Sequence, residues 1–331
     1  MFRNPPAHLP AVCQALFVTF LWSLSWVLIK LGLHDVPALT FAGLRYTLAF
    51  LCLLPLFLRF GGLAVLKKLS HRDWLALAAL GLIYYAITQG TQFLGLSYLP
   101  AVTVSLLLNL TAPAVALLGI VILAEKPTPG QWAGMGLCLA GMGLYFSGAL
   151  PSGNQLTGLL IMLVGLIANA FSAILGRGIN RRGTLSPLTI TTVSMGIGGT
   201  VLLLTGLNSQ PFPALTPGSW AIVGWLALVN TAFAFTLWNS TLRTLSAMES
   251  SLINNTMLVQ IALLAWLFLG EEITGLEIPG LLMVGLGGLL VQLRLDLKFF
   301  RPKRLKPAPE LAREERIAGK MSDKPGQGEI N

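Results

Sequence analysis

Long apolar runs separated by short polar connections make up most of the chain. Runs of the ~20 apolar residues that a helix needs to cross a bilayer lie at 11–30, 39–59, 73–94, 98–123, 130–148, 155–176, 186–206, 218–238, 247–269 and 277–293. The runs are continuous rather than alternating, which favours helices over barrel strands. The pattern predicts an all-α integral membrane protein with ten transmembrane helices in contact with the lipid bilayer.

Composition supports a membrane protein and excludes several other classes. The 331 residues are 54% hydrophobic and include 22 Lys and Arg and 13 Asp and Glu. Sixteen of these charges lie within residues 294–331, so the preceding chain has about a quarter of the charge density of a soluble protein. This excludes a soluble enzyme and a nucleic-acid-binding domain. Residues 295–331, rich in Lys, Arg, Pro and Glu, are predicted to form a disordered basic cytoplasmic tail.

The basic residues predict an orientation in the membrane. With a cytoplasmic N-terminus, 20 of the 22 Lys and Arg fall at the termini or in connections on the cytoplasmic side. The connections predicted on the outer side, at 95–97, 149–154 and 207–217, carry no charge. We therefore expect a multi-pass protein of the cell (cytoplasmic) membrane with both termini in the cytoplasm. The net charge of +9 then reports topology rather than a nucleic-acid partner.

The chain also contains an internal repeat. A shift of 146 positions places Tyr98–Phe146 on Thr244–Gln292 and pairs Ser105/Ser251, Asn109/Asn255, Glu125/Glu271, Thr128/Thr274, Gly134/Gly280 and Gly141/Gly287. A shift of 147 positions pairs Lys30 with Arg177. Because each half has five spans, the second half is expected upside down relative to the first. We predict two inverted five-helix repeats, 11–148 and 155–293, an arrangement typical of secondary transporters.

The repeated motif resembles a known family. It consists of a small residue, Ser, an apolar run, Pro, a Glu that closes the helix and a Gly-rich helix: Ala101, Ser105, Pro113, Glu125, Gly134 and Gly141 in the first copy. Together with Phe41–Tyr46, it resembles the EamA-type transporters of the drug/metabolite transporter superfamily over about residues 11–293. The resemblance implies a ten-helix permease of the inner membrane, often an exporter of amino acids or other small metabolites. Val259 replaces the proline in the second copy, which leaves a kink there open.

Polar and aromatic residues within the spans are the candidate substrate-binding residues, because polar groups at membrane depth must face protein or a wet cavity. Tyr85, Gln89 and Gln92 follow helical spacing and share one face. The set predicts a central polar cavity for a small-molecule substrate, with hydrogen bonds between helices as the alternative for any single amide. The candidates are Trp22, Trp26, Arg45, Tyr85, Gln89, Gln92, Asn109, Asn169, Asn230, Trp238 and Asn255.

Three charged residues lie near the ends of spans, and their roles are open to interpretation. Arg45 lies six positions into its span, about 9 Å from the start, and either extends outward to the interface or binds a carboxylate of the substrate with its planar fork. Lys30 is interpreted as an interface anchor. Glu249 either pairs with Arg243 or takes part in proton coupling.

The glycines of the fifth and tenth spans predict close helix packing, with a homodimer surface as the alternative. The three cysteines form no CxxC pair. The sequence contains no GxxxxGK[ST], HExxH or GxSxG motif, and we expect no metal, no cofactor and no enzymatic activity. The predicted function is secondary transport of a small organic metabolite, such as an amino acid or related compound, by alternating access and in the export direction. A membrane-embedded enzyme and a passive channel are the alternatives.

Overall fold

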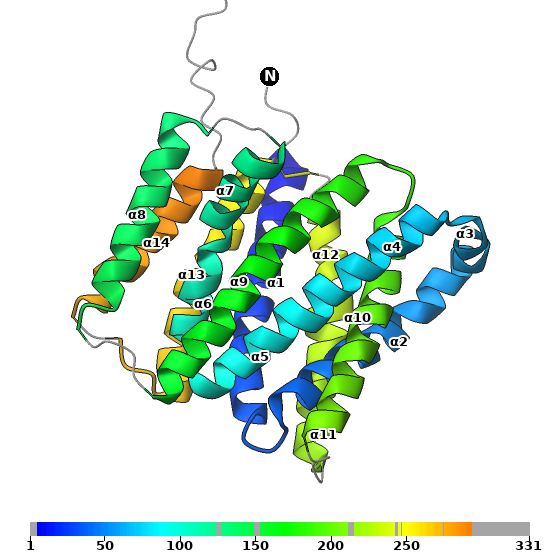
Figure 1. Cartoon of the computed structure of the whole chain (residues 1–331), viewed down its shortest axis with the longest axis horizontal. Helices are drawn as coiled ribbons and strands as arrows, with labels where there is room; N and C mark the ends of the chain where they lie inside the picture. The colour runs from blue at the N-terminus through cyan, green and yellow to red at the C-terminus, as the bar shows by residue number, and fades with distance from the viewer. Residues whose placement is uncertain are drawn as a thin grey trace, which may run out of the picture. The chain divides into compact units, whose positions relative to one another are not determined.

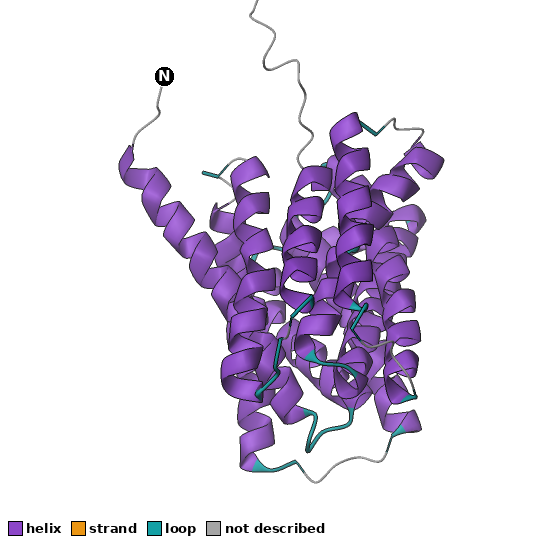
Figure 2. Ribbon diagram, turned by 90° about the vertical axis from the view of Figure 1, so that its left-hand side faces the viewer, coloured by secondary structure: helices purple, strands orange, loops and turns teal. Residues whose placement is uncertain are grey.

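The computed structural model describes residues 5–123, 127–148, 153–210, 215–241, 244–245, 247–273 and 275–292. They belong to one compact unit, Met1–Arg294, and the second unit, Leu295–Asn331, lies outside the described residues together with the predicted disordered tail. All regular structure in the described ranges is helical (Figure 2). The predicted all-α class is therefore observed in these residues, and their helices fit a membrane protein.

Helices lie at each of the ten predicted positions in the described part of the chain (Figure 1). The first half contains α1 (Pro5–Gly32), α2 (Ala38–Arg59), α3 (Gly62–Lys68), α4 (His71–Leu80), η1 (Gly81–Thr88), α5 (Gln89–Tyr98), α6 (Ala101–Asn109), α7 (Thr111–Leu123) and α8 (Pro129–Tyr145). The second half contains α9 (Asn154–Arg181), α10 (Pro187–Ser209), α11 (Pro217–Ala227), η2 (Leu228–Phe233), α12 (Ala234–Thr241), α13 (Ala247–Leu269) and α14 (Glu277–Gln292). The short π-helices η1 and η2 are continuous with the α-helices on either side.

Seven helical segments within the described residues are long and apolar enough to cross a bilayer. They are His8–Gly32, Ala38–Arg59, His71–Tyr98, Ala101–Ile120, Asn154–Asn180, Pro187–Ser209 and Leu252–Leu269. Helices α8 and α14 have 17 and 16 residues and fall short of that length, and the segment formed by α11, η2 and α12 is not among the seven either. The predicted count of ten crossings is therefore taken up below as a proposal.

Local sequence explains where several helices begin. Thr128, Ser186 and Thr216 each precede a proline, and each side chain accepts a hydrogen bond from the backbone N–H three residues later. A hydroxyl at this position satisfies one of the free N–H groups of the first turn, and proline at the next position loses no helical hydrogen bond. These caps define the starts of α8, α10 and α11.

Close packing of α8 on α14 depends on glycine. The two helices lie side by side at the left of Figure 1, and a side chain at Gly134 would lie 2.7 Å from the carbonyl oxygen of Gly287. The same holds for Gly141, which would approach the carbonyl oxygen of Gly280 to 2.7 Å. Only hydrogen fits at these positions, so the predicted close helix packing is confirmed for this pair of helices.

These contacts also relate the two halves. A shift of 146 residues converts the contact of Gly134 with Gly287 into that of Gly280 with Gly141. The two π-helices begin 147 residues apart, at Gly81 and Leu228. Both features are expected of two copies of one unit that face each other across a two-fold axis.

The proline of the repeated motif changes helix geometry in the first copy alone. Pro113 has no N–H to donate, and the helix is interrupted at Leu110 between α6 and α7. In the second copy Val259 keeps its N–H, and α13 runs without interruption from Ala247 to Leu269. The question of a kink at Val259, left open by the sequence, is answered by a continuous helix.

Candidate functional site

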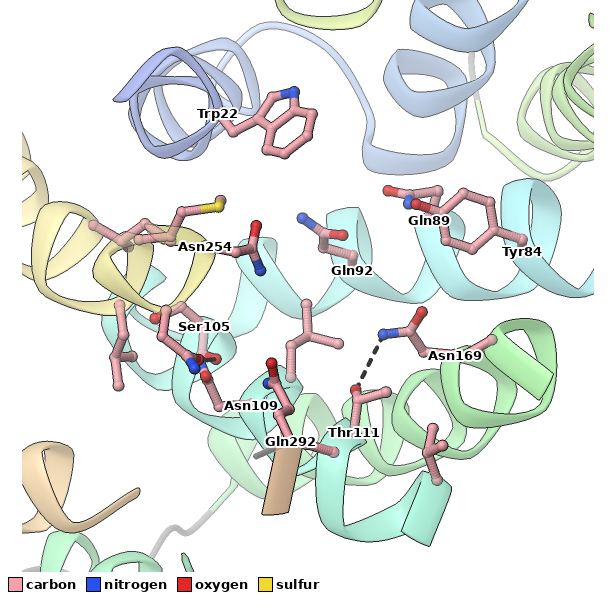
Figure 3. A pocket seen from close by; sticks show the side chains of 18 of the residues that line it. Trp22, Tyr84, Gln89, Gln92, Ser105, Asn109, Thr111, Asn169, Asn254 and Gln292 are labelled. Carbon is pink, nitrogen blue, oxygen red and sulfur yellow. Dashed lines mark hydrogen bonds between the residues drawn. The ribbon is translucent and has the colours of Figure 1, made fainter. Parts of the chain in front are cut away.

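A cavity of 840 Å³ lies among the helices of both halves. In Figure 3, Trp22, Gln92, Asn109 and Asn169 surround a common space, and they come from α1, α5, α6 and α9. Residues of α2, η1, α7, α8, α12, α13 and α14 complete the wall. The volume is in the range of small-molecule sites, and the wall mixes apolar, aromatic and amide side chains as such sites do.

Nine of the eleven candidate residues line this cavity: Trp22, Trp26, Arg45, Tyr85, Gln89, Gln92, Asn109, Asn169 and Asn255. They come from six separate segments of the sequence, so the fold brings together what helical spacing could relate only within one span. The placement supports the prediction of a central polar cavity. Their role in binding substrate remains a prediction.

The other two candidates, Asn230 and Trp238, are not among the lining residues. Asn230 is fully buried, and its amide nitrogen donates to the carbonyl oxygen of Leu21 in α1. The Trp238 ring lies 5.3 Å from that of Trp22 and packs in the contact between α1 and α12. The structure therefore places both residues in contacts between helices, which for Asn230 was the alternative interpretation.

Several lining residues were not among the candidates: Tyr46, Tyr84, Thr111, Gln131, Arg177, Phe235, Asn254 and Gln292. Tyr84 is adjacent to Tyr85, and ordinary α-helical spacing would turn the two side chains about 100° apart. Both reach the cavity from η1, where the wider π turn changes that spacing. Arg177 could have been found as the repeat partner of Lys30, since the match was visible in the sequence.

Arg45 contacts one member of an aromatic cluster. Its guanidinium carbon lies 5.2 Å from the centre of the Tyr46 ring, a distance suited to a cation–π contact. The Tyr46 ring packs 5.5 Å from Tyr85, and its hydroxyl donates to Gln89 Oε1 at 2.6 Å. Arg45 Nε also lies 3.4 Å from the hydroxyl oxygen of Thr231 in η2. Arg45 is only 6% exposed, so the structure does not support extension of its side chain outward to the interface.

The amide side chains differ in how far the protein satisfies them. Asn169 Nδ2 donates to Thr111 Oγ1 at 3.0 Å, a contact between the two halves that Figure 3 marks. Asn109 Nδ2 donates to the Ser105 carbonyl oxygen of its own helix at 2.9 Å. Asn255 Nδ2 is buried and has no hydrogen-bond partner in the described residues. A buried donor without a partner is costly, and a ligand in the cavity could satisfy it.

The cavity reaches one end of the helical bundle. Its lining extends to Gln131 at the start of α8, Arg177 near the end of α9 and Gln292 at the end of α14. Arg177 and Gln292 are exposed, so solvent reaches the cavity from this end. This is also the end at which α1 begins (Figure 1). We call it the open end.

The opposite end is packed shut. Phe41, one turn closer to this end than Arg45, packs edge-on against Phe93 at 5.3 Å, and both are fully buried. A side chain at Gly32 would clash with the Phe41 ring, so α1 also closes on this pair. We call this the closed end.

Two charged side chains connect helices at the closed end. Lys30 Nζ donates to the carbonyl oxygens of Leu96 and Leu99, both at 2.6 Å. Glu271, in the connection between α13 and α14, accepts from the backbone N–H groups of Ala101 and Val102 at 2.7 and 3.1 Å. A cation at the C-terminus of α5 and an anion at the N-terminus of α6 both suit the helix dipoles. Lys30 therefore holds a helix end, rather than acting as the simple interface anchor expected.

Glu249 lies near the open end, and its Oε1 lies 2.8 Å from His8 Nε2, a contact that connects α1 to α13. Its expected partner, Arg243, lies outside the described residues. A second cavity of 400 Å³ lies at the closed end between Tyr145, Gln155 and Glu277. Among the described residues, no group of three or more His, Cys, Asp or Glu is arranged to hold a metal ion.

Comparison with known proteins agrees with this architecture. The model of the EamA-like transporter family matches the chain twice, at residues 9–147 and 156–293. A solved structure described only as "Crystal structure of protein" covers 86% of this chain and 98% of its own, with a TM-score of 0.58 and 17% identity, a likeness of fold alone.

Curated relatives carry transporter names. An "Uncharacterized transporter" of Archaeoglobus fulgidus is 30% identical over 66% of this chain and 75% of its own length. A "Probable amino-acid metabolite efflux pump" of Escherichia coli strain K12 is 27% identical over 82% of this chain and 92% of its own length. The "Uncharacterized inner membrane transporter YedA" of the same strain is 25% identical over 70% of this chain and 74% of its own length. With both halves of a multi-pass helical bundle matched by one family model, the chain belongs to the EamA-like transporter family, and its general role is that of a membrane transporter.

Proposed function

We propose that the protein is a secondary transporter that exports a small organic metabolite, such as an amino acid or a related compound, by alternating access. The observation that carries this proposal is the 840 Å³ cavity, which both halves line and whose described lining reaches one end of the bundle, while Phe41 packs against Phe93 at the other. A channel would need a path open at both ends. A carrier instead exposes one site to each side in turn.

The proposed topology has ten crossings with both termini in the cytoplasm. Helices α8 and α14 would then cross as a pair, each about 25 Å long at 1.5 Å per residue, with a modest local thinning of the bilayer. Basic Arg177 at the open end and the neighbouring cationic connections favour this end as cytoplasmic. The structure then corresponds to an inward-facing state in which an exported substrate enters.

Alternating access in this proposal exchanges the arrangements of the two ends. Lys30, which is bonded at the closed end, has Arg177 as its repeat partner at the open end. When the halves rock, the Lys30 and Glu271 contacts would break and equivalent contacts would form around Arg177. Two packings of similar energy are what such a transition requires.

Transport by the purified protein tests the proposal. The full chain in proteoliposomes is presented with a panel of labelled amino acids and other small metabolites, with and without a pH gradient. We expect saturable movement of at least one solute, and sensitivity of its accumulation to the gradient if protons are the coupling ion. Export is tested separately in cells, as a lower internal level of that solute when the protein is expressed. The absence of saturable movement for the whole panel would contradict the proposal.

A further inference from the structure

The charges of the cavity wall are of one sign. Arg45 and Arg177 line it, and none of its lining residues in the described chain is Asp or Glu. The remaining wall consists of apolar, aromatic, hydroxyl and amide side chains. Water and counter-ions screen Arg177 at the exposed mouth, whereas Arg45 is 6% exposed deep in the cavity. The deep part of the site therefore carries an isolated positive charge.

The protein holds Arg45 in place without neutralising it. The hydroxyl of Thr231 accepts from Arg45 Nε at 3.4 Å and itself donates to the Leu226 carbonyl oxygen at 2.9 Å, which fixes its orientation within η2. The Tyr46 ring contributes a further contact at 5.2 Å. No carboxylate within the described residues forms an ion pair with Arg45. Its terminal nitrogens, which carry four of the five N–H donors of the fork, are not engaged in these contacts.

A buried cation without a counter-ion is costly, and proteins usually pair it. A ligand carboxylate that replaces the missing counter-ion could form two parallel hydrogen bonds with the fork, which are about twice as strong as neutral ones. An ammonium group brought to the same place would be repelled. The charge of this site should therefore discriminate between ligands more strongly than their shape does.

Two parts of the cavity wall suit a flat apolar group. The Trp22 ring lies 5.3 Å from Phe235, and Tyr84 lies 4.8 Å from Tyr85, so the cavity has aromatic surfaces on α1 with α12 and on η1. Gln92 and Asn254 offer neutral donors and acceptors along the same cavity (Figure 3). Amides can bind a hydroxyl or a carbonyl group, but they give an ammonium no compensating charge.

From this charge pattern we propose that the transported substrate is an organic anion, a carboxylate with a flat apolar body, whose carboxylate binds Arg45. The proposal rests on the proposed transport function and narrows its substrate class. It ranks ligands of equal size by charge: anion first, zwitterion next, neutral molecule after that and cation last.

Binding of four matched probes tests this ranking. The probes are 3-phenylpropanoate, phenylalanine, 3-phenylpropanamide and phenethylamine, and binding to the full chain in nanodiscs is measured by calorimetry. We expect the anion to bind on the order of tenfold more tightly than the neutral amide, as for a hydrogen bond to a charged group. Arg45→Gln should abolish this difference, and Arg45→Lys should retain part of it because the charge remains without the fork.

Lys68→Gln is the matched control, because it removes an exposed cation of α3 that does not line the cavity. It should preserve the tenfold difference, and elution as a single species on gel filtration shows that each variant is folded. Equal binding of the four probes, preference for the amine, or no binding of any probe would overturn the proposal. Saturable transport of a neutral or cationic solute would overturn it as well, while leaving the proposed transport function intact. Binding of the anion without transport of any solute would instead contradict the proposed transport function and leave the preference of the site for anions intact.

Discussion

Replacement of Lys30 by methionine should open the closed end. Lys30→Met keeps an unbranched side chain, shorter by one atom, but removes both hydrogen bonds from Nζ to the carbonyl oxygens of Leu96 and Leu99. Those carbonyls end α5 beside the start of α6, so the bonds hold α1 against the junction of the two helices. Without these bonds, α1 loses its charged side-chain contact with α5 and Leu99 and keeps its packing against Phe41.

The magnitude follows from the two bonds. A hydrogen bond to a charged group contributes about 1.5–3 kcal/mol, and Lys30 is half-buried, so part of this is recovered from water in the variant. We take about 2 kcal/mol for the pair. Since 1.4 kcal/mol corresponds to a factor of ten, the ratio of outward-open to inward-open protein should rise by about 25-fold.

Cysteine labelling measures this ratio. A single cysteine at Gln92, in a chain whose three native cysteines are replaced, is exposed to a membrane-impermeant maleimide added outside spheroplasts. Because Gln92 lines the cavity, its labelling rate from outside follows the fraction of outward-open protein, and Lys30→Met should raise that rate by up to about 25-fold while the inward-open state predominates. Lys68→Met, which removes an exposed cation, is the control and should not change it. An unchanged rate in folded Lys30→Met would refute the idea that Lys30 holds this end closed.

Two further predictions concern packing and topology. Gly141→Ala should lower the melting temperature of the detergent-purified protein by several degrees, because its new methyl group would lie 2.7 Å from the Gly280 carbonyl oxygen. Gly143→Ala on the same helix is the control: its methyl group meets nothing within 4 Å, so it should be neutral. Equal melting temperatures for the two variants would contradict the packing argument. C-terminal fusions to a reporter active only in the cytoplasm should work after residue 180 and be silent after residue 152, and the opposite pattern would invert the proposed orientation.

The positions of the helices could be predicted from the sequence because apolar length is the main requirement for a membrane helix. Span 3 was expected at 73–94, and the structure forms a continuous helical segment from His71 to Tyr98 there. The proline in the first copy and its absence from the second raised the question of a kink, because a proline removes one hydrogen bond of the helix. The π-helices were not predicted, because one extra residue in a turn leaves the apolar pattern of a span almost unchanged.

The candidate site was predicted less completely, for a related reason. Polarity within a span shows that a side chain needs a partner, but it does not show whether the partner is water in a cavity or another helix. Gln92 and Asn255 reach the cavity, whereas Asn230 donates to a backbone carbonyl of α1. Lys30 was placed at the interface because the carbonyls of Leu96 and Leu99, which bind it, are backbone groups that leave no mark in the sequence.

Counterflow through a cavity filled by mutation tests the central claim most directly. Ala116 lines the cavity on α7, and Ala116→Trp should occupy the substrate path, whereas Ala133→Trp places the same ring on the exposed side of α8. Proteoliposomes loaded with an unlabelled solute receive trace labelled solute outside, and labelled solute that enters is counted over time. We predict saturable counterflow for the wild type and Ala133→Trp, and none for Ala116→Trp at equal protein content. Equal counterflow in all three, or in none, would contradict transport through this cavity.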